Sequence, residues 1–268
     1  MTKLLSLFSL RKKVALVTGG GRNLGYAMAS ALAEAGASVI VTSRTLAVAE
    51  RAARLLRRKY QVPTLALALD QRDHAAVAAT VAAAAKWKGR IDILVNNAGG
   101  GSGHSAGHLF QRAPADVENL VQTNLVGVLH CCQEVGRIMG RQGHGKIINI
   151  ASVSGLVGRD RRVYARSQMK GQPVDYAAAK AGVIGLTRDL AGLLSPLGIN
   201  VNAISPGGFA RETMPKTFIR DYSNLTPMGR MGREDTDLKG AVVFLAAPAS
   251  DYVTGVNLVV DGGFSIWR

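Results

Sequence analysis

The sequence predicts an α/β fold in which one doubly wound parallel sheet of about seven strands has helices on both faces. Short runs of β-branched and aliphatic residues alternate along the chain with Ala-rich stretches that have the composition of helices. The runs are apolar at consecutive positions, which is typical of strands buried between two layers of helices. The expected strands are residues 13–19, 37–43, 63–70, 91–99, 146–152, 199–206 and 256–263.

The chain of 268 residues is expected to form a single domain, residues 1–268, because no repeat, low-complexity tract or change of composition marks a linker. No apolar run approaches the roughly 20 residues that span a bilayer. The apolar start, residues 1–13, leads into the first strand without a cleavage site, so we expect a lead-in strand or arm. The adjacent Cys131 and Cys132 cannot form a disulfide framework, which predicts a reducing, cytoplasmic location.

The net charge of +15 and the isoelectric point near 10.3 would suit a nucleic acid, a membrane surface or an anionic small molecule as partner. The basic residues lie in small clusters, at 11–13, 51–59 and 159–170, without zinc-ligand spacing, an RNA-binding aromatic motif or a long basic tail. Clusters of this size usually face water. We therefore expect a small-molecule substrate, and no metal site, membrane partner or nucleic-acid partner.

The segment TGGGRNLG, residues 18–25, follows the first expected strand directly and opens the first expected helix. Glycines permit a tight turn and a close approach of the backbone, and the free N–H groups at a helix start attract a pyrophosphate. A glycine cluster alone is weak evidence, because ordinary turns explain many such runs, but the strand and helix on either side strengthen it. The segment predicts a Rossmann-like dinucleotide-binding site.

This run resembles the TGxxxGxG loop of the short-chain dehydrogenase/reductase family, and the family's other motifs follow in order. They are NNAG at 96–99, TNLVG at 123–127, ASVSG at 151–155, YAAAK at 176–180 and SPGG at 205–208, so the resemblance covers nearly the whole chain. One departure is Asn23, which stands where the family usually has its middle glycine. Asn tolerates unusual backbone angles better than other non-Gly residues, so we expect the turn to survive.

The end of the second expected strand predicts which dinucleotide binds. A fold that prefers NAD carries an acidic residue there for the ribose 2′-hydroxyl group, whereas this chain has Ser43 followed by Arg44. A 2′-phosphate would meet no repelling carboxylate and could be held by the guanidinium groups of Arg44 and Arg22. The pattern predicts NADP. The alternative is that both arginines simply face water.

The resemblance also implies the residues that contact the cofactor. They are Gly19, Gly21, Arg22, Asn23, Leu24, Gly25, Ser43, Arg44, Asp70, Asn97, Ala98, Gly99, Tyr176, Lys180, Pro206, Gly207 and Phe209. Asp70 ends the third expected strand and resembles the family's adenine-contacting aspartate, but it could equally be the N-cap of the following helix.

Two tyrosines, Tyr164 and Tyr176, lie twelve positions apart, and their neighbours distinguish them. Tyr176 is followed four residues later by Lys180, on the same face of a helix, whereas the matching position after Tyr164 is Gln168. A nearby cation lowers the pKa of a tyrosine, so this pair could exchange a proton near neutral pH. Such pairs are also common on helix surfaces, and the assignment therefore depends on the surrounding motifs.

The resemblance implies the catalytic set Asn124, Ser152, Tyr176 and Lys180. Ser152 would hydrogen-bond the substrate carbonyl, and Tyr176 would pass the proton. Lys180 would tune Tyr176 and hold the nicotinamide ribose, and Asn124 would support a relay water. By itself, Asn124 could also be a helix-interior amide that binds the backbone.

The distance in sequence from Ser152 to Tyr176 is 24 residues, about twice that of many family members. The resemblance therefore implies a substrate-loop insertion within 156–173, roughly Arg159 to Lys170. Tyr164 lies near the usual spacing without a matching Lys, so we expect it in the substrate wall.

The insertion carries Arg159, Arg161, Arg162, Arg166 and Lys170 but only one acid, Asp160. In a loop over the crevice, such a cluster attracts anions, and an arginine can hold a carboxylate bidentately. This predicts an acidic substrate. The alternatives are a solvated basic loop and a loop that packs on a neighbouring subunit.

Together these features predict an NADP(H)-dependent oxidoreductase that interconverts a secondary alcohol and a ketone, on a sugar acid or keto acid. Residues 226–264 resemble the gluconate 5-dehydrogenase-type branch and also the 3-oxoacyl carrier-protein reductases, so the latter activity is an alternative. A non-catalytic cofactor-sensing or nucleic-acid-binding relative is an alternative of another class, and the intact catalytic set argues against it. Members of the family usually form symmetric oligomers, so the resemblance implies a homodimer or homotetramer.

Overall fold

The computed structural model describes residues 3–100 and 108–267, and its centre is a seven-stranded parallel sheet in the order β3-β2-β1-β4-β5-β6-β9. Its strands are β1 (Val14–Val17), β2 (Ser38–Ser43), β3 (Thr64–Ala68), β4 (Ile93–Asn96), β5 (Gly145–Ile150), β6 (Ile199–Pro206) and β9 (Asn257–Val260). Each overlaps one of the segments expected from the sequence. The predicted α/β, Rossmann-like fold is confirmed.

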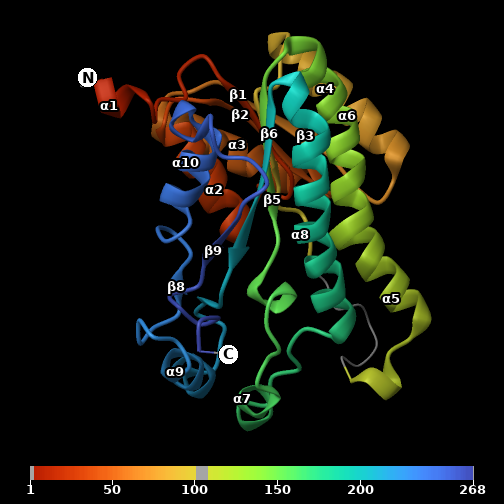
Figure 1. Ribbon diagram of the computed structural model, residues 1–268, viewed down its shortest axis with the longest axis vertical. Coiled ribbons are helices and arrows are strands. Elements are labelled where there is room, and N and C mark those ends of the chain that lie inside the picture. Colours follow the sequence, from red (N-terminus) through yellow and green to blue (C-terminus); the bar gives the residue numbers. More distant parts are fainter. Residues whose placement is uncertain (1–2, 101–107, 268) are drawn as a thin grey trace.

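Helices cover both faces of this sheet (Figure 1). One layer contains α2 (Asn23–Glu34), α3 (Leu46–Tyr60) and α10 (Lys239–Ala246), and the other contains α4 (His74–Lys88), α6 (Gly127–Gln142) and α8 (Val174–Leu194). Strand β1 shows how the sequence specifies two faces: Ala15 and Val17 pack into the first layer, whereas Val14 and Leu16 pack into the second. Alternating side chains point to opposite faces, so a strand between two apolar layers is apolar throughout.

Shorter elements complete the chain. They are α1 (Lys3–Ser6), η1 (Leu109–Gln111), α5 (Pro114–Val121), the π-helical turn η2 (Gln122–Val126), η3 (Val153–Gly155), α7 (Arg161–Arg166), η4 (Ser195–Leu197), β7 (Phe209–Ala210), α9 (Lys216–Asn224), β8 (Gly232–Arg233) and η5 (Pro248–Ser250). The expectation of a lead-in strand at the start is wrong, because α1 is helical. Strands β7 and β8 form a second, two-stranded sheet that the sequence pattern did not indicate. No helix among the described residues is long and apolar enough to cross a membrane.

The strand order creates a crevice beside β1. The chain passes outward from β1 to β2 and β3 and then returns to β4 on the other side of β1. At such a switch point the loops after the two adjacent strands separate, and ligands of α/β sheets bind there. Helices α7 and α9 and the C-terminal end of the chain also lie toward this end of the molecule, at the bottom of Figure 1.

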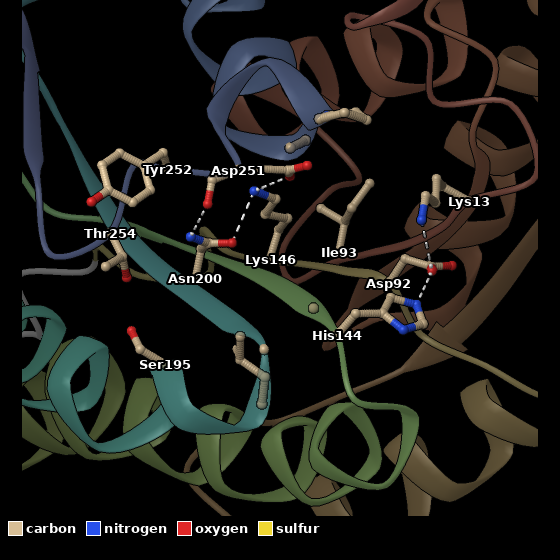
Figure 2. Close-up of a pocket in the computed structure, with 15 residues that line it drawn as sticks. Lys13, Asp92, Ile93, His144, Lys146, Ser195, Asn200, Asp251, Tyr252 and Thr254 are labelled. Atoms are coloured by element: carbon tan, nitrogen blue, oxygen red, sulfur yellow. Dashed lines mark hydrogen bonds and ion pairs between the residues drawn. The ribbon is translucent and has the colours of Figure 1, made fainter.

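A pocket also lies at the opposite end, where β4, β5 and β6 begin (Figure 2). Its charged side chains are paired with one another. Asp92 contacts Lys13 at 3.6 Å and His144 at 2.9 Å, and Lys146 contacts Asp251 at 2.9 Å. These contacts join the starts of neighbouring strands, and the pocket is remote from the crevice.

Candidate active site

The loop after β1 has the geometry of a phosphate-binding turn. Gly19 has a φ of 62°, a left-handed conformation that glycine adopts without strain. A Cβ atom on Gly25 would clash with Gly19 O and with the side chain of Asn97, so only glycine fits there. The N-cap residue Arg22 has extended backbone and makes no side-chain capping bond to the first turn of α2. The first N–H groups of α2 are thus available to a pyrophosphate, and the loop fits a dinucleotide.

Asn23, the residue that departs from the family pattern, has a φ of 50°. This left-handed conformation costs most residues 1 kcal/mol or more but is tolerated by Asn. The expectation that the turn survives the replacement of glycine is confirmed.

We expect Asn23→Gly to change the free energy of unfolding by less than about 1 kcal/mol, because glycine also accepts a positive φ. Asn23→Val should lower that free energy by about 1–3 kcal/mol, because a β-branched side chain is strained there. Urea denaturation measures both. Equal stability of the Val variant and the wild type would contradict the left-handed assignment.

The loop after β4 is tied to the phosphate loop. Asn97 donates from Nδ2 to Thr18 O at 3.0 Å and to Gly19 O at 3.2 Å. Thr18 Oγ1 accepts from the backbone N–H groups of Asn97 and Ala98, both at 3.0 Å. A Cβ atom on Gly99 would lie 2.7 Å from Asn124 Oδ1, so glycine lets this loop approach the next helix closely. The structure thus brings these predicted cofactor residues together at the switch point.

The residues that predict NADP lie at the other side of the phosphate loop. Ser43 ends β2, and Arg44 and Arg22 are exposed. Neither arginine takes part in any ion pair formed among the described residues. Both guanidinium groups therefore remain available to a phosphate.

Asp70 does not cap the helix that follows it. The N-cap of α4 is Asp73, which accepts from the backbone N–H groups of Ala75 and Ala76. Asp70 instead pairs with Arg72 at 2.5 Å, and this hydrogen-bonded guanidinium holds the pKa of Asp70 below its usual value. The capping alternative is wrong, and the adenine contact stays a prediction.

The segment after β6 closes the crevice from the C-terminal side. Pro206 ends β6, and a Cβ atom on Gly207 would lie 2.8 Å from Asp261 Cα. The side chain of Phe209 is only 6% exposed and packs in the core, so only its backbone can reach a cofactor. Gly208 N donates to the hydroxyl group of Tyr222 at 2.7 Å, a contact that no sequence motif indicated.

The side chains of Ser152, Tyr176 and Lys180 converge where β5 and α8 meet. Lys180 is buried, donates from Nζ to Ile150 O at 2.7 Å, and lies 5.8 Å from the centroid of the Tyr176 ring. Ser152 Oγ accepts from Ser154 N at 3.1 Å, and Ser152 is close enough to Tyr176 to lower the pKa of its hydroxyl group. The predicted serine, tyrosine and lysine therefore form one cluster.

Burial controls the ionisation of this cluster. It raises the pKa of Tyr176, and the hydrogen bond with Ser152 and the positive charge of Arg159 oppose that rise only in part. Burial also lowers the pKa of Lys180 to about 8. The expected lowering of the Tyr176 pKa by Lys180 is wrong for these residues alone, because desolvation disfavours both charged forms. Tyr176 thus keeps its proton at neutral pH.

Asn124 lies within η2, a π-helical turn of a kind often found at functional sites. Its Nδ2 donates to Leu120 O at 3.0 Å and to Gly100 O at 3.1 Å, and its Oδ1 accepts from Gly100 N at 2.8 Å. The alternative that this amide binds the backbone is therefore confirmed. The relay water stays a prediction.

The basic residues of 159–170 have different surroundings. Arg162 pairs with Asp160 and Arg166 pairs with Asp221, each at 2.9 Å. Arg161 is exposed and donates to Gln172 O at 2.8 Å. Arg162 and Arg166 are therefore neutralised by acids, whereas the attraction of a substrate anion by Arg159, Arg161 and Lys170 stays a prediction.

Arg159 and Tyr164 are the members of this segment that interact with Tyr176. Arg159 is half-buried and donates from Nη2 to Pro173 O at 3.1 Å. Its guanidinium group thus lies at the N-cap residue of α8, Pro173, and it interacts electrostatically with both Tyr164 and Tyr176. The ring of Tyr164 packs against Phe218, with 5.1 Å between centroids. Tyr164 thus lies near Tyr176, as a residue of the substrate wall would.

Two side-chain contacts near the site were not predicted by any sequence motif. Gln71 is buried and donates from Nε2 to Ala98 O at 2.9 Å and to Thr123 O at 2.6 Å, which joins the β4 loop to η2. Arg112 pairs with Asp175, the residue before Tyr176, at 2.8 Å. Both contacts join residues far apart in the chain, and neither residue type is unusual in its local sequence.

A family model of short-chain dehydrogenases and reductases, described as enoyl-(acyl carrier protein) reductase, matches residues 19–265. The chain belongs to the short-chain dehydrogenase/reductase family. The family predicted from the sequence motifs is confirmed. This short-chain dehydrogenase/reductase is an oxidoreductase, and its family uses a nicotinamide cofactor.

Several relatives of this short-chain dehydrogenase/reductase match it along nearly its whole length. The 2-dehydro-3-deoxy-D-gluconate 5-dehydrogenase of Dickeya dadantii is 38% identical, with 97% of this chain and 98% of the relative covered. The 3-oxoacyl-[acyl-carrier-protein] reductase of Vibrio harveyi is 37% identical, with 95% and 98% covered. A gluconate 5-dehydrogenase from Burkholderia cenocepacia, solved in complex with NADP and tartrate, is 36% identical with a TM-score of 0.88, and 98% and 99% are covered.

Proposed function

We propose that this enzyme interconverts a ketone and a secondary alcohol with NADP(H), on a small acidic substrate such as a sugar acid or keto acid. The observation that carries the proposal is the cluster of Ser152, Tyr176 and buried Lys180 beside the phosphate loop. A proton donor held next to a hydroxyl group and beneath a dinucleotide site suits the reduction of a carbonyl group.

The residues of the cluster have distinct roles in this proposal. Ser152 hydrogen-bonds the substrate oxygen, and Tyr176 donates its proton to that oxygen as the carbonyl group becomes an alcohol. The raised pKa of Tyr176 keeps the proton in place at neutral pH, which favours the reducing direction. Lys180 orients the ribose of the cofactor from beneath Tyr176, and Asn124 holds the adjacent loop. When bound, the nicotinamide ring supplies or accepts the hydride.

The preference for NADP rests on charge. Arg22 and Arg44 flank the end of β2 without ion-pair partners among the described residues, and Ser43 supplies no competing carboxylate. Guanidinium groups bind phosphate bidentately, so a 2′-phosphate gains affinity that a 2′-hydroxyl group cannot. The related gluconate 5-dehydrogenase was solved with NADP, which supports the same choice.

An acidic substrate is favoured by Arg159, which lies beside Tyr176. The tartrate in the related gluconate 5-dehydrogenase is also an acid. A 3-oxoacyl carrier-protein substrate is the second candidate, because a 3-oxoacyl-[acyl-carrier-protein] reductase is among the relatives at similar identity.

We expect kcat/KM for NADPH to exceed that for NADH by at least about tenfold, which corresponds to roughly 1.4 kcal/mol. Steady-state kinetics with a panel of keto acids, ketoses and 3-oxoacyl thioesters measure this preference and rank the substrates. Ser43→Asp should reduce the ratio of kcat/KM for NADPH to kcat/KM for NADH, because the new carboxylate repels a 2′-phosphate.

Arg141→Gln is the matched control for the loss of one arginine, because Arg141 is exposed in the last turn of α6. It should leave the cofactor preference unchanged, whereas Arg44→Gln should reduce it. Equal use of NADH and NADPH would refute the cofactor assignment. A chain that binds NADPH and reduces no ketone would favour the non-catalytic alternative.

A further inference from the structure

Arg159 is a half-buried cation without an acidic partner. It takes part in no ion pair among the described residues, and its pKa is lowered, chiefly by desolvation. One of its N–H groups donates to Pro173 O, and the guanidinium group interacts electrostatically with Tyr164. A guanidinium group has five N–H donors, so Arg159 retains donors for a ligand. A desolvated, unpaired charge is unfavourable until an anion approaches it.

The acids that could neutralise Arg159 from within the chain are already occupied. Asp160 accepts from Arg162 through both of its carboxylate oxygens. Asp175, two residues after Pro173, forms an ion pair with Arg112 at 2.8 Å. Neither of these carboxylates is therefore available to neutralise Arg159.

Tyr164 supplies a second polar group near Arg159, and packing holds its ring in place. Its ring packs on Phe218, and a Cβ atom on Gly171 would lie 2.9 Å from its Cδ1 atom. Gly171 has a φ of 64°, so the backbone bends closely against the ring. The ring packs against a small apolar cluster that includes Val153, Val163 and Phe218.

We propose that Arg159 and the hydroxyl group of Tyr164 bind a carboxylate of the substrate beside Tyr176 and thereby select hydroxy acids and keto acids. This inference rests on the proposed function and adds the residues that recognise the acid. The arginine offers a fork of N–H groups, and the tyrosine offers one O–H group, which together match the two oxygens of a carboxylate. A thioester carbonyl or a neutral ketose would leave the guanidinium group unpaired, which disfavours both.

The same contact links substrate binding to proton transfer. The positive charge of Arg159 lowers the pKa of Tyr176, in opposition to burial. A carboxylate on Arg159 would cancel that charge, so Tyr176 would hold its proton over a wider pH range when the acid is bound. An acidic substrate thereby keeps the proton donor in its working state.

The test compares tartrate with threitol, which has the same carbon chain and central hydroxyl groups but two CH₂OH groups in place of carboxylates. Calorimetric titrations with each probe are run on the full-length protein with and without saturating NADP⁺. The wild type should bind tartrate at least about 30-fold more tightly than threitol, as expected for a charge-assisted bidentate contact.

Arg159→Gln should weaken tartrate binding about 30-fold or more and leave threitol binding within about threefold, because only the charged contact is lost. Arg159→Lys should restore part of the tartrate affinity, because it keeps the charge but not the fork. Arg141→Gln is the control, because Arg141 is exposed in the last turn of α6 and its loss frees no acid beside Arg159. It should change neither affinity.

Three results overturn the proposal: equal wild-type affinities for the two probes, no tartrate binding in either titration, or Arg159→Gln losing both probes equally. The last would mean that Arg159 only supports the loop. Turnover separates these failures from a failure of the proposed function. An enzyme that reduces a keto acid with NADPH but binds tartrate as well after Arg159→Gln keeps its function and loses this recognition site.

Discussion

Tyr176→Phe should lower kcat by about 10³-fold, within the range that a positioned acid or base contributes. The substitution removes the hydroxyl group that we propose donates the proton, but it keeps the ring beside Lys180. NADPH binding should stay within about threefold of the wild type, because the phosphate loop and Arg44 are untouched. Stopped-flow measurement of NADPH oxidation, together with fluorescence titration of NADPH, separates the two effects.

Two other tyrosines serve as comparisons. Tyr164→Phe should raise KM for an acidic substrate and retain most of kcat, because Tyr164 adjoins Arg159 and lacks a lysine partner. Tyr252→Phe should change nothing, since Tyr252 is fully exposed at the pocket where the strands begin. A collapse of kcat in the Tyr164 variant with activity kept in the Tyr176 variant would reverse the assignment.

The fold was predictable because its information is local. Consecutive apolar residues in β1 already require two covered faces, and the two packing layers receive alternate residues of that strand. The phosphate loop was predictable for the same reason, since Gly19, Asn23 and Gly25 are constrained by a single turn. The β7–β8 pair was not, because two-residue strands carry no periodicity.

The sequence predicts those site residues that belong to motifs. It does not predict which charged residues are paired with one another in the folded chain. The sequence shows five basic residues in 159–170 as equivalent, and only tertiary contacts single out Arg159. Arg166 is neutralised by Asp221, which lies 55 residues away in α9. The predicted direction of the Tyr176 pKa shift was wrong for a related reason. Spacing indicates that a lysine is near, but it does not reveal that both groups are desolvated.

The ion pair between Arg112 and Asp175 should have the largest effect on stability. Its side chains are 3% and 6% exposed, and it joins the segment after β4 to the start of α8, the helix that carries Tyr176 and Lys180. Removing one partner of a buried pair leaves an uncompensated charge and costs about 3–5 kcal/mol. Asp175→Asn keeps the size of the side chain, and Arg112 retains Asp116 at 3.7 Å, so its loss should fall at the lower end.

Arg112→Met should cost more than Asp175→Asn, because it leaves both Asp175 and Asp116 without this cation. The double variant Arg112→Met with Asp175→Asn should be more stable than the sum of the single losses predicts, since neither charge of the pair then remains buried. Urea denaturation at neutral pH gives the three free energies of unfolding. Additive losses, or single losses below about 1 kcal/mol, would show that the pair is solvated and weak. The kcat of Asp175→Asn supplies an independent readout. Because Asp175 directly precedes Tyr176 in α8, a loosened helix start should lower kcat, and it should lower kcat more than the affinity for NADPH, because the phosphate loop is untouched.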